Sequence, residues 1–68
     1  MSSEPFGTWL RRQAHRQDPV GDLARDFKAS GSRAYTEVGV RENMTRHDAC
    51  DLAWVALESA VDEWTAIG

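Results

Sequence analysis

Apolar residues recur every three or four positions along the last third of the chain. Between Thr45 and Ala66 this spacing places acidic residues on the opposite arc of a helix, and the segment contains no glycine or proline. The pattern predicts a long helix over 45–66 with Thr45 as its N-cap. Its apolar stripe comprises Ala49, Leu52, Ala53, Ala56, Leu57, Ala60 and Trp64, widened by Cys50, Trp54 and Val61.

Two further helices are predicted in the first half of the chain, joined by a tight corner. The first runs from about Glu4 to Arg16, with Ser3 as its N-cap. The second begins at Pro19 and ends before Gly31, a natural left-handed stop. Asp18 precedes this helix and is its expected N-cap.

A close approach between elements is predicted at Gly21, in the first turn of the second helix. We expect the side chain of Trp9 to be the neighbour that needs this space. The large apolar residues of the three helices form the predicted core, which comprises Phe6, Trp9, Leu10, Leu23, Ala24, Phe27, Leu57 and Trp64.

The segment 32–44 carries the weakest signal. It can be read as a short strand over 35–40 or as an irregular helical turn over 36–43, and Gly39 interrupts both readings. We expect a loop with a short helix, in which Tyr35 and Val38 fill the core. The chain is therefore predicted to be a single all-α domain over 1–68, a bundle of three to four helices with a long C-terminal helix.

Composition favours a cytoplasmic domain. The 68 residues include one cysteine, so no internal disulfide can form, and the N-terminal residues do not resemble a secretory signal. No apolar run reaches the ~20 residues needed to cross a bilayer, which argues against a membrane partner. The net charge of −3 is unevenly distributed, because residues 1–34 carry +2 and residues 35–68 carry −5. An acidic total disfavours non-specific binding to nucleic acid.

One stretch resembles a known family. The segment WLRRQAHRQDPVGDLARDFKASG is similar to the small bacterial YozE-like proteins in its Trp-Leu pair and its Asp-Pro-hydrophobic-Gly-Asp-Leu-Ala signature. Phe6 before the pair and Gln13 after it fit the same pattern, and the C-terminal Ala60 and Trp64 are also similar to it. The resemblance implies a sterile-alpha-motif-like helical bundle. It implies no established activity, cofactor or catalytic residue.

The candidate chemistry is sparse. His47, Cys50 and Asp51 have a spacing that could place metal ligands on one side of a helix, but a structural zinc site normally needs four ligands. The same His–Cys pair lacks an oxyanion loop that would support nucleophilic catalysis. We therefore expect neither an enzyme nor a metal or cofactor site.

Two classes of partner stay open. The first is another protein, or a second copy in a homodimer, bound by the outer arc of the C-terminal helix. There Leu52 and Val55 interrupt the acids, unless the segment 32–44 covers them. The residues of this predicted contact are Leu52, Val55, Asp51, Glu58 and Asp62.

The alternative partner is nucleic acid. Residues 20–40 can be read as a helix-turn-helix in which residues 32–40 form the helix that enters the major groove. The residues that read the DNA would then be Arg33, Tyr35, Thr36 and Arg41. In a weaker version, arginines of the first helix contact phosphates. The arginines of this predicted site are Arg11, Arg12, Arg16, Arg33 and Arg41.

Overall fold

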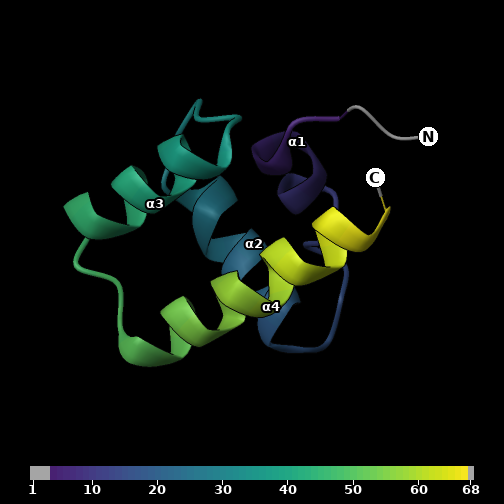
Figure 1. Ribbon diagram of the computed structural model, residues 1–68. Coiled ribbons are helices and arrows are strands. Elements are labelled where there is room, and N and C mark those ends of the chain that lie inside the picture. Colours follow the sequence, from purple (N-terminus) through teal and green to yellow (C-terminus); the bar gives the residue numbers. More distant parts are fainter. Residues whose placement is uncertain (1–3, 68) are drawn as a thin grey trace.

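The computed structural model describes residues 4–67, which form four helices and no strand. α4 crosses α2, its main packing partner, whereas α1 contacts all three other helices (Figure 1). The predicted small all-α bundle is confirmed, and the predicted N-cap at Ser3 lies outside the described residues. The helices are α1 (Phe6–Arg11), α2 (Pro19–Ala29), α3 (Glu37–Arg46) and α4 (Asp51–Ile67).

α1 is shorter at both ends than the helix predicted over 4–16. Pro5 occupies the N-cap position, and the chain leaves the helix at Arg12. The turn that follows exposes backbone carbonyls, and the side chain of Arg25 satisfies two of them. Its Nη1 donates to the carbonyl oxygens of Ala14 and Arg16, each at 2.8 Å. A side chain from α2 therefore stabilises the turn that follows α1.

The predicted boundaries of α2 are confirmed. Asp18 caps the helix by accepting the N–H of Gly21 at 2.9 Å, and Gly31 has the left-handed φ of 71° that ends it. The close approach at Gly21 is also confirmed, but its predicted neighbour is wrong. A Cβ at this position would overlap the carbonyl oxygen of Arg16 rather than meet Trp9.

The helix predicted over 45–66 is wrong in its first turns. Thr45 belongs to α3, and α4 begins only at Asp51. Sequence reasoning missed the N-cap of α3, which is Thr36, whose Oγ1 accepts the N–H of Gly39 at 3.0 Å. Between the helices Asp48 has a φ of 53°, and the chain turns so that α3 and α4 run in roughly opposite directions (Figure 1).

The core lies where the four helices meet. Of the predicted core residues, only Trp64 is half-buried rather than buried. Its ring meets the fully buried Phe6 edge to face at 5.5 Å, and its Nε1 donates to the carbonyl oxygen of Glu4 at 2.9 Å. The start of α1 is thus fastened to the end of α4.

The prediction that Tyr35 and Val38 fill the core is wrong. Both are more than half exposed. Because α3 begins at residue 37, its inward face carries Val40 and Met44, which are buried, along with Asn43. The Asn43 Nδ2 donates to the hydroxyl of Ser30 at 3.3 Å, so this buried amide has a partner.

Candidate protein-binding site

An open groove of about 320 Å³ lies between α2 and the first two turns of α4. Each helix contributes apolar side chains to its lining, and α2 adds two carboxylates. We call it the α2–α4 groove. It is lined by Pro19, Asp22, Leu23 and Asp26 from α2, by Leu52, Ala53, Val55 and Ala56 from α4, and by Cys50, which precedes α4.

Leu52 and Val55 are the exposed apolar residues of this groove. Leu52 is 79 % exposed and Val55 is 64 % exposed, so the segment 32–44 does not cover them. The two residues are three apart on α4 and therefore project from the same side of the helix. Ala56 and Leu57, which follow on α4, are buried in the core instead. The outer arc of α4 thus presents an apolar pair to solvent.

The charges around the groove are negative on both helices. Asp51 follows Cys50 at the start of α4 and is exposed, as predicted for the acidic arc. Asp22 and Asp26 of α2 were not expected to belong to this surface. Asp22 forms an ion pair with Arg25, whereas Asp26 and Asp51 have no ion-pair partner among residues 4–67.

The two other acids of the predicted contact lie further along α4, away from the groove lining. Asp62 is exposed, and Glu58 accepts a hydrogen bond from Arg41 of α3. Of the predicted site, the groove lining therefore contains Leu52 and Val55, whereas Asp51 precedes Leu52 in the chain and, like Glu58 and Asp62, is not part of the lining. The contribution of α2 had no sequence signal, because nothing local indicates which helix packs beside α4.

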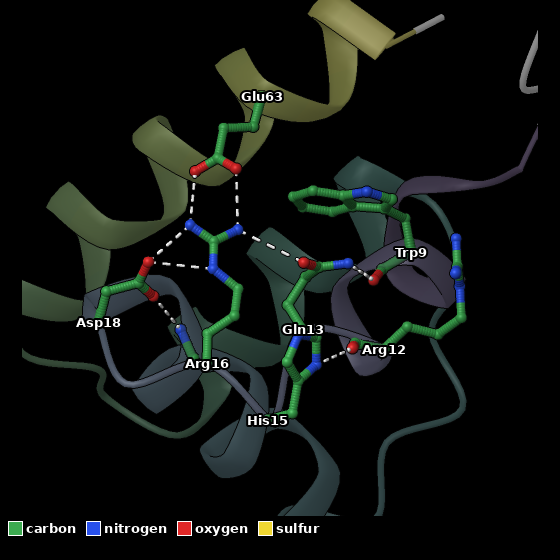
Figure 2. A network of polar contacts seen from close by, with 8 residues as sticks. Trp9, Arg12, Gln13, His15, Arg16, Asp18 and Glu63 are labelled. Carbon is green, nitrogen blue, oxygen red and sulfur yellow. Dashed lines mark hydrogen bonds and ion pairs between the residues drawn. The ribbon is translucent and has the colours of Figure 1, made fainter.

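Arg16 fastens α4 to the corner before α2. Its Nη1 and Nη2 donate to the two carboxylate oxygens of Glu63 at 2.8 and 3.0 Å, and its Nη2 also lies 2.6 Å from Asp18 Oδ2 (Figure 2). The carboxylate of Glu63, and then that of Asp18, raises the pKa of the Arg16 guanidinium above its usual range. This bidentate geometry fixes the angle at which α4 crosses the corner.

A second arginine joins α3 to α4. Arg41 Nη1 donates to Glu58 Oε2 and its Nε donates to Glu37 Oε2, both at 3.0 Å. These two carboxylates raise the pKa of Arg41, with Glu58 the larger cause. α4 is thus held by one arginine near its middle and by another near its C-terminal end.

Asp18 provides the first prediction, which concerns acid stability. The Arg16 guanidinium, together with the Gly21 N–H, lowers the pKa of the Asp18 carboxyl below its usual value. A lowered folded-state pKa adds stability that is complete above the unfolded value of about 3.9 and is lost as pH falls through the folded value. We expect Asp18→Asn to keep the cap but to reduce the fall in melting temperature between pH 5 and pH 2.

Asp18→Ala is the matched comparison, because it removes the cap as well. It should melt several degrees below Asp18→Asn at pH 7. Thermal unfolding followed by circular dichroism across this pH range measures both effects. Parallel pH profiles for wild type and Asp18→Asn would show that the ion pair with Arg16 does not contribute to stability.

The arginines of the alternative nucleic-acid site are mostly engaged within the domain. Arg16 and Arg41 form the ion pairs described above, and Arg12 pairs with a carboxylate. Arg11 donates to a backbone carbonyl and lies over an aromatic ring. Arg33 has no hydrogen-bond or ion-pair partner among residues 4–67.

The helix predicted to enter the major groove has other boundaries than expected. Residues 32–36 form an extended approach to α3 rather than helix, so Arg33 and Tyr35 precede the helix. Of the predicted contact residues only Arg41 lies on α3, and two carboxylates hold its guanidinium. The segment 20–46 does not reproduce the predicted helix-turn-helix register.

The predicted spacing of His47, Cys50 and Asp51 does not fall on one helix. His47 is the C-cap of α3, whereas Asp51 is the first residue of α4. Within the described part of the chain, no group of three histidine, cysteine or acidic side chains is arranged to hold a metal ion. None of the helices formed by residues 4–67 has the length and apolar character required to cross a bilayer.

Comparison of the chain with protein-family models, with curated proteins and with solved structures finds no match. The resemblance to the YozE-like family and the cytoplasmic location therefore stay predictions.

Proposed function

We propose that this chain is a non-enzymatic interaction module that binds another protein through the α2–α4 groove. The observation that supports this proposal most is the exposure of Leu52 and Val55 beside an apolar lining. Apolar side chains gathered at a concave surface are typical of contact sites on small proteins. Covering these two side chains contributes ~1.5–3 kcal/mol for each.

The charges at the groove favour a basic partner. Asp22 and Asp26 line the groove with the apolar pair, and the exposed Asp51 precedes Leu52 in the chain. No ion pair within residues 4–67 neutralises Asp26 or Asp51. A partner with lysine or arginine beside its apolar residues complements them. Two copies that met through the same groove would bring like charges together. This face is therefore better suited to a different protein than to a symmetric homodimer.

The dimensions of the groove favour a helix. Its α2 side extends from Pro19 to Asp26, which corresponds to about 10 Å at 1.5 Å per residue. Two turns of a partner helix cover this length and offer apolar residues at i, i+4 and i+7. We infer an amphipathic helix with a narrow apolar stripe and basic residues on both sides of it.

Selection from a displayed library of helical peptides tests this proposal. We expect the wild-type domain to select peptides with the apolar spacing and basic flanks just described. Val55→Glu should weaken their binding at least tenfold, because it adds a carboxylate to an acidic rim and removes an apolar contact. Isothermal titration with one selected peptide measures the change.

Ile67→Glu is the matched control. Ile67 is also an exposed apolar residue of α4, but it lies at the far end of the helix. It should leave peptide binding unchanged, and neither variant should shift the melting temperature by more than a few degrees. Equal losses in both variants, or selected peptides without basic flanks, would overturn the proposed site.

Nucleic acid is the competing outcome of the same experiment. A labelled duplex and a labelled single strand can be titrated with the domain at several salt concentrations. Binding by phosphate contacts would weaken steeply with salt, with a slope of about −0.9 for each contact on a duplex. Such a complex, insensitive to Val55→Glu and abolished by Arg33→Glu, would replace the protein partner by nucleic acid.

A further inference from the structure

The linker between α3 and α4 consists of residues 47–50, and one of them has a left-handed backbone conformation. Asp48 has a φ of 53° and is the sole non-glycine residue with positive φ among residues 4–67. The N–H of Ala49 donates to the Met44 carbonyl at 3.0 Å, and the N–H of Asp48 donates to the Thr45 carbonyl at 3.2 Å. These two bonds form a Schellman motif, in which this position is usually glycine. A side chain here carries a conformational cost that glycine avoids.

The local sequence favours a helix through this linker. Residues 40–67 contain no glycine or proline, which is why a helix was predicted across it. His47, Asp48 and Cys50 are exposed, and of the four linker residues only Ala49 is half-buried. Straightening the linker therefore disrupts little packing of its own side chains. In this linker the helix propensity of the sequence favours a continuous helix, whereas the closed fold requires a turn.

A continuous helix cannot fit within one closed domain. From Glu37 to Ile67 it would have a length of about 46 Å, at 1.5 Å per residue. The longest dimension of the domain is 33 Å. α4 would therefore leave its own α2 and expose Leu57 and Ala60, which are now fully buried. A second copy opened in the same way offers the α2 surface and arginine partners that α4 has lost.

We propose that two copies of this chain exchange α4, with α3 and α4 joined into one helix in each copy. Each half of the dimer consists of α1–α3 from one copy and α4 from the other. Arg16 and Arg41 of one copy then pair with Glu63 and Glu58 of its partner. All the contacts of the closed domain return except the Schellman turn, which is replaced by helix. The α2–α4 groove is rebuilt in each half, so the exchange does not depend on the proposed function.

Two substitutions at Asp48 test the exchange in opposite directions. Asp48→Gly suits the left-handed turn and weakens a continuous helix, whereas Asp48→Ala does the reverse. The proteins are refolded from denaturant at about 1 mM and are examined by size exclusion with light scattering. We expect the dimerisation constant of Asp48→Ala to exceed that of Asp48→Gly at least about a hundredfold. Each of the two linkers in the dimer contributes about a tenfold factor to this difference. Equal dimerisation of the two variants, or monomers alone in both, would overturn the proposal.

A mixing experiment shows whether α4 is the exchanged element. In the Asp48→Ala background, one protein carries Arg16→Glu and the other carries Glu63→Arg. Each alone places like charges together at positions 16 and 63, but in a mixed dimer both halves have opposite charges there. After co-refolding, mixed dimers should predominate over both homodimers. A statistical mixture, or dimers that Val55→Glu abolishes, would indicate association through another surface.

Discussion

Gly21→Ala should remove a large part of the stability of the domain. A Cβ at this position would overlap the carbonyl oxygen of Arg16 and lie 2.6 Å from its carbonyl carbon. Backbone atoms form the obstacle, so no rotamer change removes the overlap. We expect a loss of at least about 3 kcal/mol, since overpacking of this severity forces the backbone to move. A domain of this size has roughly 3–10 kcal/mol of stability in total.

Gly39→Ala is the matched control, because it makes the same change in another helix. There the added Cβ would meet the Ala34 Cβ at 3.0 Å and the Thr36 hydroxyl at 3.1 Å, contacts that a small shift relieves. The gain in helix propensity of up to ~1 kcal/mol offsets part of this strain. Its melting temperature should lie within several degrees of wild type. If both alanine variants melt alike, the corner at Arg16 is not tight.

Phe6→Ala should have the other large effect. Phe6 is fully buried, stacks on Trp9 with ring centroids 6.0 Å apart, and meets Trp64 in a T-shaped contact. Its removal leaves a cavity between α1 and α4 and should cost roughly 3–5 kcal/mol. Chemical denaturation followed by tryptophan fluorescence measures this loss. A cooperative transition close to that of wild type would mean that the aromatic cluster does not hold α1.

Trp64→Phe separates ring packing from hydrogen bonding in the same cluster. It keeps an aromatic ring against Phe6 but removes the donor to the Glu4 carbonyl. We expect a loss of about 0.5–1.5 kcal/mol, the usual value for one hydrogen bond, plus a small packing change. A loss equal to that of Phe6→Ala would place the main anchor of α1 at Trp64 instead.

Local signals predicted α2 well because they determine it. Its cap at Asp18 and its stop at Gly31 act within a few residues of the ends they set. The end of α1 could not be predicted in this way. The turn that takes the place of its predicted last residues is stabilised by Arg25, which satisfies carbonyls nine and eleven residues earlier in the chain. Only the packing of α2 beside that corner brings the side chain within reach.

The break between α3 and α4 is also determined by packing between helices rather than by local signals. No residue in 45–50 stops a helix, and the sequence predicts at most an irregular turn from Thr36, which in fact caps a regular helix. Burial of Met44 on one side and Leu57 on the other requires the chain to reverse between them. Tertiary packing therefore overrides helix propensity at the linker. Because α3 begins at residue 37 and turns Val40 and Met44 inward, Tyr35 precedes the helix and Val38 lies on its exposed side.

The candidate binding site was predictable in part. The exposed pair Leu52 and Val55 could be singled out from the acids around it, although the predicted stripe also placed Leu52 on the inward face. Six consecutive apolar residues leave the rotation of such a helix undetermined. The residues that α2 contributes to the groove, including Asp26, could not be predicted. They depend on which two helices pack together, and the periodicity within one helix does not encode that pairing.

The three buried positions of α4 carry two alanines and one leucine, with larger half-buried side chains around them. Ala56 and Ala60 are buried, Ala53 is half-buried, and Leu57 is the one large side chain buried fully on this helix. A side chain larger than alanine at these buried positions would find no free volume in the close-packed core. The close packing of α4 against the other helices therefore requires small residues there. Over evolutionary time these positions can exchange among glycine, alanine and serine. A larger residue becomes acceptable only when a facing side chain shrinks first, so the lineage must change both helices in that order.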